Sequence, residues 1–389
     1  MIPGGQVRVI VSCVPQTGHL LPLLPLAEAF SAQGDEVTVA SGPDAEAVAT
    51  SRGLGFRAVG PGFDAWFDAL GRRTRGLPGD GLAPERVESY FVPRLFAEIG
   101  TAFMVDDLLK LCEELEPALL VFDPYVFAAP LVAELTGTAS VLHNIGALMS
   151  FDVLELASDA VSPIWREFGI SVPEAAGVFA GTTLAICPYS LDPNVIDLAR
   201  VRPLRPVPVP LASPVALPVS LPDPARPLVY VTLGTFSNND LDLFRLILAA
   251  LDHEPVNVLA TIGRDNDPVA LAPLPDNARV ARFIPQAELL PHCSVVVHHA
   301  GAGTTFGVLA HGLPAVAVPQ SADNFVMAGR LATSGAARTL MPGEVTGDAV
   351  RSAVRVALED PKCRYQAQLL AEEIAGMPPP GEVAADLRT

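Results

Sequence analysis

Residues 295–318 have the sequence VVVHHAGAGTTFGVLAHGLPAVAV, and this stretch determines the class of fold. The β-branched run at Val295–His298 predicts a buried strand, and the small residues after it predict a tight turn. A helix is expected over Thr304–His311 and a second strand over Ala315–Val318. Two strands joined by a helix in this way form the repeating unit of a parallel sheet.

The same alternation of strands and helices extends over the rest of the chain. We therefore predict an α/β fold with two Rossmann-like domains, each built on a parallel sheet covered by helices. In the N-terminal half, strands are expected at Val7–Cys13, Glu36–Ala40, Ala118–Phe122 and Ala139–His143, with helices at His19–Gln33 and Ala128–Thr136. In the C-terminal half, further strands are expected at Leu228–Leu233, Val256–Ile262 and Ala278–Phe283, with helices at Asp240–Leu251 and Asn324–Ser334.

A proline-rich segment separates the two halves. Prolines recur every few residues from Pro203 to Pro227, which makes this stretch extended and stiff. We expect residues 1–202 to form the first domain, residues 203–227 the linker and residues 228–389 the second domain. The two domains are expected to face each other across a cleft, with the C-terminal helix packing back on the first domain.

The composition excludes several classes of partner and site. With 25 basic and 43 acidic residues, the net charge is −18, so nucleic acid and anionic membrane surfaces are not expected partners. Five scattered cysteines without a CxxC motif argue against a disulfide framework or a zinc site. No secretion signal and no uninterrupted apolar run of about 20 residues is visible, so we expect a cytoplasmic protein.

The first candidate catalytic pair is His19 with Asp123. His19 comes shortly after the first strand, at the start of a helix, and Asp123 directly follows the strand Ala118–Phe122. Ligands of open parallel sheets bind beyond the carboxyl ends of the strands, where both residues are expected. A neutral imidazole held by a carboxylate is suited to act as a general base. A capping or core histidine with an unrelated aspartate remains the structural alternative.

The glycine-rich turn after the strand Val295–His298 predicts a site for a diphosphate. Gly301 and Gly303 let the backbone approach a ligand closely, and the helix start presents free N–H groups. His299, Thr304 and Thr305 add side-chain donors. The spacing of Gly301, Gly303 and Gly307 also approaches the dinucleotide fingerprint, so a nicotinamide-dependent oxidoreductase remains an alternative.

Acidic residues in the C-terminal half have two interpretations. Asp323 and Asn324 follow a strand and suit sugar hydroxyls, although a helix cap is equally consistent with them. Two carboxylate pairs have the D-x-D spacing that binds a metal in some enzymes, and we interpret both as structural: Asp240/Asp242 and Asp265/Asp267. No metal site is therefore expected.

Two segments together resemble the family-one glycosyltransferases of GT-B fold, and especially the actinobacterial enzymes that decorate natural products with deoxysugars. They are PQTGHLLPLLPLAEAFSAQGDEVTVA at residues 15–40 and RFIPQAELLPHCSVVVHHAGAGTTFGVLAHGLPAVAVPQSADNFVMAGRL at residues 282–331. The resemblance covers essentially the whole chain. It implies that residues 1–202 bind the acceptor and residues 228–389 bind a nucleotide sugar.

Carried over by position, the resemblance implies a role for each matching residue. His19 matches the family's catalytic base, and Asp123 matches the carboxylate that pairs with it. The implied donor-binding residues are Gly234, Thr235, Phe283, Ile284, Gln286, His299, Gly301, Gly303, Thr304, Thr305, Asp323 and Asn324.

Three departures from the family pattern concern the donor. Phe283 stands where a tryptophan often stacks on the base, and Asn324 stands where glutamine is usual. Gly307 stands where relatives that use UDP-glucose often place a glutamate that holds the ribose hydroxyls. A thymidine nucleotide lacks the 2′-hydroxyl, so the glycine at 307 favours a TDP-linked deoxysugar over a UDP-sugar.

The acceptor is expected to be hydrophobic. Aromatic residues gather in the first domain, and ordinary core packing is the competing explanation for them. The predicted acceptor-binding residues are Phe63, Trp66, Phe67, Phe91 and Met149.

The sequence therefore predicts an inverting, metal-independent glycosyltransferase with no cofactor besides the nucleotide sugar. Its expected partners are a nucleotide-sugar donor and a small-molecule aglycone, and a homodimer remains open. An inactive nucleotide-sugar-binding auxiliary protein of the same fold is the main alternative. An oxidoreductase and an epimerase of sugar nucleotides are weaker ones.

Overall fold

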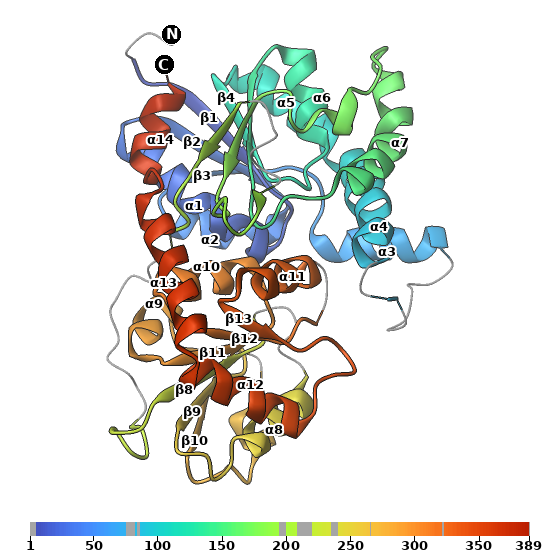
Figure 1. The fold of residues 1–389 in the computed structure, drawn as a ribbon. Coiled ribbons are helices and arrows are strands. Elements are labelled where there is room, and N and C mark those ends of the chain that lie inside the picture. The colour runs from blue at the N-terminus through green and yellow to red at the C-terminus, as the bar shows by residue number, and fades with distance from the viewer. Residues whose placement is uncertain are drawn as a thin grey trace. The chain divides into compact units, whose positions relative to one another are not determined.

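The computed structural model describes residues 5–74, 82–83, 86–193, 200–207, 220–234, 240–264, 266–320 and 323–388. The chain forms two compact units (Figure 1). The first unit comprises Met1–Cys187, Asn194–Arg205 and Met377–Thr389, and the second comprises Pro188–Pro193 and Pro206–Gly376. Each unit is an α/β domain built on a parallel sheet, which confirms the predicted fold class.

The first unit contains a parallel sheet in the order β3-β2-β1-β4-β5-β6-β7. Strand β4 has the sequence LLVF and is buried along its whole length, as expected for a strand covered by helices on both faces. The four predicted strands of this half are present, whereas β3, β6 and β7 were not predicted. The strands are β1 (Arg8–Ser12), β2 (Glu36–Ser41), β3 (Gly55–Ala58), β4 (Leu119–Phe122), β5 (Ala139–His143), β6 (Thr182–Ala185) and β7 (Val201–Pro203).

Helices cover both faces of this sheet. The first ends where Gly34 takes a φ of +89°, a left-handed conformation that glycine adopts easily. The C-terminal helix α14 (Pro380–Leu387) packs against α1 of the same unit (Figure 1). The other helices are α1 (Thr17–Ala32), α2 (Glu46–Ser51), α3 (Phe63–Thr74), α4 (Val87–Phe91), the π-helical segment η3 (Val92–Gly100), α5 (Thr101–Leu115), α6 (Ala128–Thr136) and α7 (Phe151–Glu167).

The second unit repeats this design with the strand order β10-β9-β8-β11-β12-β13. Its strands are β8 (Leu228–Thr232), β9 (Asn257–Thr261), β10 (Ala278–Ala281), β11 (Val295–His298), β12 (Ala315–Ala317) and β13 (Ala337–Thr339). Its helices are α8 (Leu241–Ala250), α9 (Gln286–Leu289), α10 (Ala302–Ala310), α11 (Asn324–Ser334), α12 (Gly347–Glu359) and α13 (Pro361–Gly376). The predicted strands and helices are confirmed, except that Phe283 lies beyond the end of β10. Strand β13 and helices α9, α12 and α13 were not predicted.

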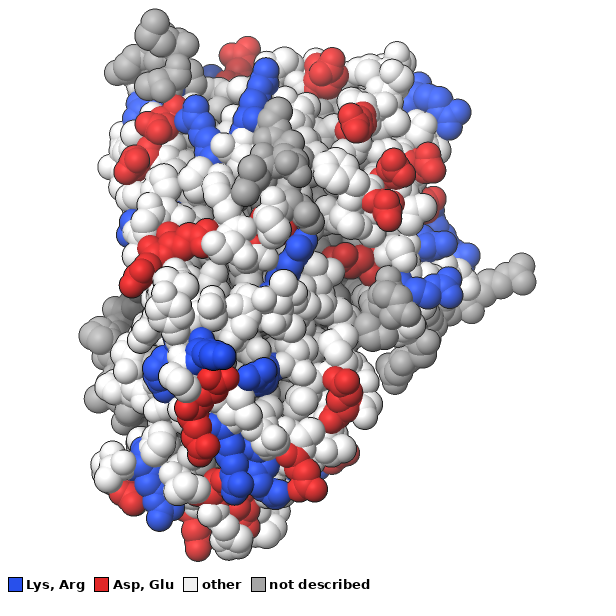
Figure 2. Space-filling view, viewed as in Figure 1, with Lys and Arg blue, Asp and Glu red and all other residues white. Residues whose placement is uncertain are grey.

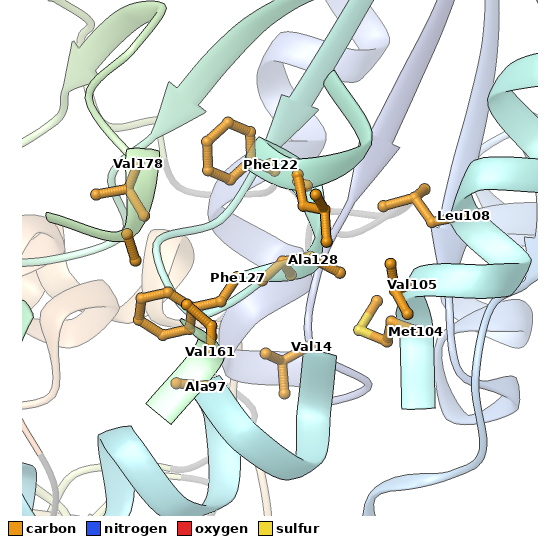
Figure 3. Packing of buried hydrophobic residues seen from close by; sticks show 14 of the residues in the cluster. Val14, Ala97, Met104, Val105, Leu108, Phe122, Phe127, Ala128, Val161 and Val178 are labelled. Atoms are coloured by element: carbon orange, nitrogen blue, oxygen red, sulfur yellow. The ribbon is translucent and has the colours of Figure 1, made fainter. Parts of the chain in front are cut away.

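The core of the first unit draws side chains from several elements. Figure 3 shows Phe122 from β4, Phe127, Met104 from α5 and Val161 from α7 converging in one buried cluster. This packing fixes the end of β4, which the candidate site uses. Side chains that are far apart in sequence therefore pack together around the carboxyl end of β4.

The two units differ from the predicted domain ranges in three respects. Residues Pro188–Pro193 count with the second unit, and the predicted linker is divided between the units after Arg205. Residues Met377–Thr389 count with the first unit, in line with the expectation that the C-terminal helix packs on the first domain. Within the predicted linker, residues 208–219 lie outside the described residues. Two hydrogen bonds tie the linker start to the C-terminal segment inside the first unit, from Arg205 N to the Pro378 carbonyl at 2.9 Å and from Arg205 Nε to the Met377 carbonyl at 3.0 Å.

Charged side chains of both signs are interspersed on the face shown in Figure 2. No single basic patch of the kind that binds a polyanion stands out there. In the part of the chain that the structure describes, no helix combines the length and the apolar character needed to cross a bilayer.

Candidate active site

The strand order of the first unit reverses between β1 and β4, which lie side by side. Chain segments leave these two strands toward opposite sides, so the carboxyl ends of such a pair leave an opening for a ligand. His19 and Asp123 both follow these two strands, in α1 and directly after β4. The topology therefore places the predicted pair at the position where open α/β sheets bind ligands.

The structure brings His19 and Asp123 together. The Nδ1 atom of His19 lies 3.2 Å from the Oδ2 atom of Asp123, whose side chain is fully buried. Oδ2 also accepts a hydrogen bond from the Val14 N–H at 2.8 Å, and Oδ1 accepts one from the Tyr125 N–H at 2.7 Å. These bonds stabilise the ionised carboxylate and fix its orientation. An ionised Asp123 requires the proton of a neutral His19 on Nδ1, so the lone pair lies on Nε2.

Two aromatic rings flank the His19 imidazole. Phe96 stacks on it with ring centroids 6.1 Å apart, and Tyr125 meets it edge-on at 5.1 Å. Phe96 belongs to the π-helical segment η3, a geometry that is rare and recurs at functional sites. The sequence prediction did not include either ring. The signal available for Phe96 was its place among clustered aromatics, but its proximity to His19 depends on the packing of η3.

The predicted acceptor residues occupy two kinds of environment. Trp66 is 1% exposed, and Phe63 and Met149 are also buried in the core cluster. A methyl group on Gly100 would overlap the Trp66 ring, so the indole is enclosed on that side. Phe67 and Phe91 are partly buried, with ring centroids 6.3 Å apart. The structure therefore places Trp66, Phe63 and Met149 as core residues, and leaves only Phe67 and Phe91 with accessible surface.

The second unit has the same reversal, between β8 and β11. Gly234 and His299 follow these two strands, and the imidazole of His299 lies against both Gly234 and Gly301. A methyl group at either glycine would overlap the His299 ring. Gly234 in addition has a φ of +79°, which other residues adopt only with strain. Both glycines are therefore required for the observed position of His299.

The start of α10 provides a group of hydrogen-bond donors. The N–H groups of the first helical turn have no acceptor within the helix, and Gly303 has open space where a side chain would be. Gln286 donates from Nε2 to Thr304 Oγ1 at 3.1 Å, which leaves the Thr304 O–H proton available for another acceptor. Thr305 is buried, and its hydroxyl has no partner among the residues that the structure describes.

The remaining predicted donor-binding residues that the structure describes lie in the loop after β10 and at the start of α11. Phe283 is 42% exposed, and the guanidinium of Arg264 lies over its ring at 4.2 Å, a cation–π contact that the sequence analysis missed. Ile284 is buried. Asp323 is the N-cap residue of α11, although its side chain makes no capping hydrogen bond, and Asn324 is the buried first residue of the helix. Thr235 lies outside the described residues.

The carboxylate pairs interpreted as structural have structural partners. Asp240 caps α8 by accepting the Leu243 N–H at 2.9 Å, and Asp242 pairs with Arg245. Asp267 accepts the Val269 N–H at 3.1 Å, while Asp265 lies outside the described residues. Over the described ranges, no group of three or more His, Cys, Asp or Glu side chains could hold a metal ion.

Burial keeps the histidines of the turn uncharged. It lowers the pKa of His299 to about 4, and the pKa of His298 to about 3, where neighbouring His299 adds a smaller effect. Both imidazoles are therefore neutral near pH 7. A neutral imidazole donates one N–H, so His299 can donate a hydrogen bond to a phosphate oxygen without carrying a positive charge.

Comparison with known proteins identifies the class of protein. Residues 245–389 match the family described as "Erythromycin biosynthesis protein CIII-like, C-terminal domain". The chain is 32% identical over 388 residues to L-demethylnoviosyl transferase of Streptomyces niveus, an alignment that covers 98% of this chain and 97% of that protein.

Solved structures agree with this result. The glycosyltransferase SnogD from Streptomyces nogalater is 27% identical with a TM-score of 0.77, covering 98% of this chain and 99% of that one. The glycosyltransferase VinC in complex with DTDP is 25% identical with a TM-score of 0.78, covering 98% of each chain. Fold and relatives together define a glycosyltransferase of GT-B fold. The chain belongs to the family of actinobacterial glycosyltransferases that act in antibiotic and natural-product biosynthesis.

The contact between His299 and Gly301 leads to a prediction. In Gly301→Ala, the new methyl group should displace the His299 ring. The affinity for TDP should then fall roughly 10- to 100-fold, because one hydrogen bond to a charged phosphate is lost. Stability should change little, because a side chain moves rather than the backbone. Isothermal titration with TDP and thermal melting measure the two effects.

Gly329→Ala is the matched control for this variant. Gly329 lies in α11, has an ordinary φ and has no atom within 4 Å of the place where a Cβ would lie, so the added methyl group meets no neighbour. Its TDP affinity should equal that of the wild type. Equal TDP affinities of Gly301→Ala and Gly329→Ala would contradict a role of His299 in donor binding.

Proposed function

We propose that this glycosyltransferase is inverting and metal-independent, and that it transfers a deoxysugar from a TDP-linked donor to a hydroxyl of a hydrophobic aglycone. The observation that carries the proposal is the contact of His19 with the buried Asp123 at 3.2 Å, beyond the two strands where the sheet order reverses. A histidine oriented by a buried carboxylate is the arrangement required of a general base at neutral pH.

His19 is the base in this proposal. The acceptor hydroxyl gives its proton to Nε2 of His19 as its oxygen bonds to the anomeric carbon and the bond from that carbon to the phosphate oxygen breaks. Asp123, which accepts the Nδ1–H, stabilises the imidazolium that forms. A positioned general base contributes roughly 10²–10⁴-fold to a rate.

The glycine-histidine turn of the second unit stabilises the leaving group. Negative charge grows on the diphosphate as the sugar departs, and preorganised donors lower that barrier by roughly 10²–10³-fold each. The donors are His299, the free N–H groups of the first turn of α10, and the hydroxyls of Thr304 and Thr305. Since these donors are neutral and fixed before reaction, the proposal requires no metal cation.

Two observations support TDP as the nucleotide. VinC, a relative that spans the same length, is described in complex with DTDP. Gly307 lies inside α10 and has no side chain that could hold ribose hydroxyls; a Cβ atom there would approach Leu290 Cδ1 to 3.2 Å, so Leu290 would have to shift slightly. The base would stack on Phe283 beside the Ile284 backbone. Asp323 and Asn324 would bind hydroxyls of the sugar.

The aglycone would lie against the aromatic residues beside His19. Phe96 and Tyr125 are in contact with the imidazole and with each other, their ring centroids 4.8 Å apart. Phe67 and Phe91 extend this aromatic surface along α3 and α4. Flat apolar rings bind such surfaces by stacking, which supports a hydrophobic and polycyclic acceptor.

Mass spectrometry of reaction mixtures tests the proposal. The protein would be incubated in EDTA with a panel of TDP- and UDP-linked sugars and hydrophobic aglycones. An aglycone should gain the mass of one deoxysugar, with the TDP donors giving more product than the UDP donors. TDP binding without any product across the panel would favour the auxiliary-protein alternative.

A further inference from the structure

The phosphate turn contains an unusual backbone conformation. Ala300, between His299 and Gly301, has a φ of +65°, in the left-handed region that residues with a Cβ disfavour. Ala300 is fully buried, so no ordinary surface flexibility accounts for this geometry. A conformation of this kind persists only where surrounding contacts hold it.

One such contact comes from the preceding histidine. The N–H of Ala300 donates a hydrogen bond to Nδ1 of His298 at 3.1 Å. His298 is the last residue of β11 and is fully buried. Its own carbonyl accepts the Val318 N–H at 2.8 Å, and it pairs with Thr232 and Ala317 on the two neighbouring strands. The acceptor atom therefore belongs to a residue that is held by both neighbouring strands.

The hydrogen bond defines the tautomer of His298. Because Nδ1 accepts the Ala300 N–H, the ring proton of the neutral imidazole lies on Nε2. Nε2 is buried and finds no partner among the described residues. A protonated ring would also carry a proton on Nδ1, which would face the Ala300 N–H, and the hydrogen bond would be lost. The low pKa of about 3 that burial gives His298 keeps this from happening near neutral pH.

We propose that His298 is a positioning residue for the donor diphosphate. By accepting the Ala300 N–H, it holds the left-handed turn that seats Gly301 against the His299 ring and begins α10 at Ala302. The free N–H groups of that helix start and the His299 imidazole then face one ligand. The inference rests on the proposed function, since it assumes that this turn binds the diphosphate.

Three variants separate this role from simple packing. In Asn, the side-chain Oδ1 falls near the position of the histidine Nδ1, so His298→Asn should keep the acceptor and bind TDP within about threefold of wild type. His298→Leu and His298→Gln place carbon at that position, so TDP affinity should fall roughly 10- to 100-fold. The measurement is isothermal titration of the full chain with TDP, together with donor KM and kcat.

A second substitution provides a rescue. Glycine adopts the left-handed region without strain, so Ala300→Gly should restore at least part of the TDP affinity in the His298→Leu background. If His298 had only a packing role, His298→Leu would lower thermal stability, and Ala300→Gly would not restore TDP affinity. Donor KM should rise in His298→Leu, while acceptor KM stays near the wild-type value.

The outcomes are distinct. A His298→Leu or His298→Gln protein that binds TDP as tightly as wild type would overturn the inference and leave the proposed function intact. A His298→Asn protein as weak as His298→Leu would also overturn it. A wild-type protein that does not bind TDP at all would overturn the proposed function itself, and the inference with it. If His298→Leu fails to fold, His298→Gln supplies the same comparison.

Discussion

Replacing His19 by alanine should lower kcat for sugar transfer by roughly 10²–10⁴-fold and leave the affinity for TDP unchanged. The imidazole is the only group proposed to take the acceptor proton, and it belongs to the first unit, whereas the donor residues belong to the second. A steady-state assay of TDP release at saturating donor and acceptor measures kcat. Titration with TDP measures the binding.

The exposed His292 provides the control for this experiment. His292→Ala removes an imidazole from a site that is not part of the proposed machinery, so its kcat should match that of wild type. If His19→Ala lost activity because its melting temperature had fallen, so that little folded protein remained in the assay, His19 would be a structural histidine. Full activity of His19→Ala would reject His19 as the base.

Replacing Trp66 by alanine should lower the free energy of unfolding by about 3–5 kcal/mol. The indole is 1% exposed and packs against Gly100, so its removal leaves a cavity in the core of the first unit. Folded domains are stable by only about 5–15 kcal/mol, so this is a large fraction of the total. Urea unfolding followed by circular dichroism measures the change.

Tyr365→Ala is the control for Trp66→Ala. Tyr365 is 58% exposed in the second unit, and truncating it should change the free energy of unfolding by less than about 0.5 kcal/mol. The sequence analysis placed Trp66 at the acceptor. A stable Trp66→Ala protein with a raised acceptor KM would support that placement and contradict the core assignment drawn from the structure.

Much of the fold followed from local patterns in the sequence. Strands such as Val295–His298 are β-branched and apolar over most of their length, and the small residues after them indicate a turn. Short edge strands were missed. β13 has the sequence ART and β7 has VRP, which lack both the length and the apolar run that identify a strand. Their pairing depends on neighbours that are distant in sequence.

The same distinction applies to the residues of the candidate site. His19 and Asp123 could be paired from sequence because each follows a strand, and parallel strands align their carboxyl ends. Phe96 and Arg264 could not, since their contacts with His19 and Phe283 depend on how a π-helical segment and a loop pack. Trp66 and Phe91 have similar aromatic character in the sequence. Only the packed structure separates a core residue from an accessible one.

The anomeric configuration of the product tests the central claim most directly. If His19 activates the acceptor oxygen for a single attack on the anomeric carbon, proton NMR coupling constants should show a configuration opposite to that of the donor sugar. The account predicts inversion in every product formed, with EDTA present. A product that retains the donor configuration would contradict it, because retention requires two successive displacements or attack from the face of the leaving diphosphate.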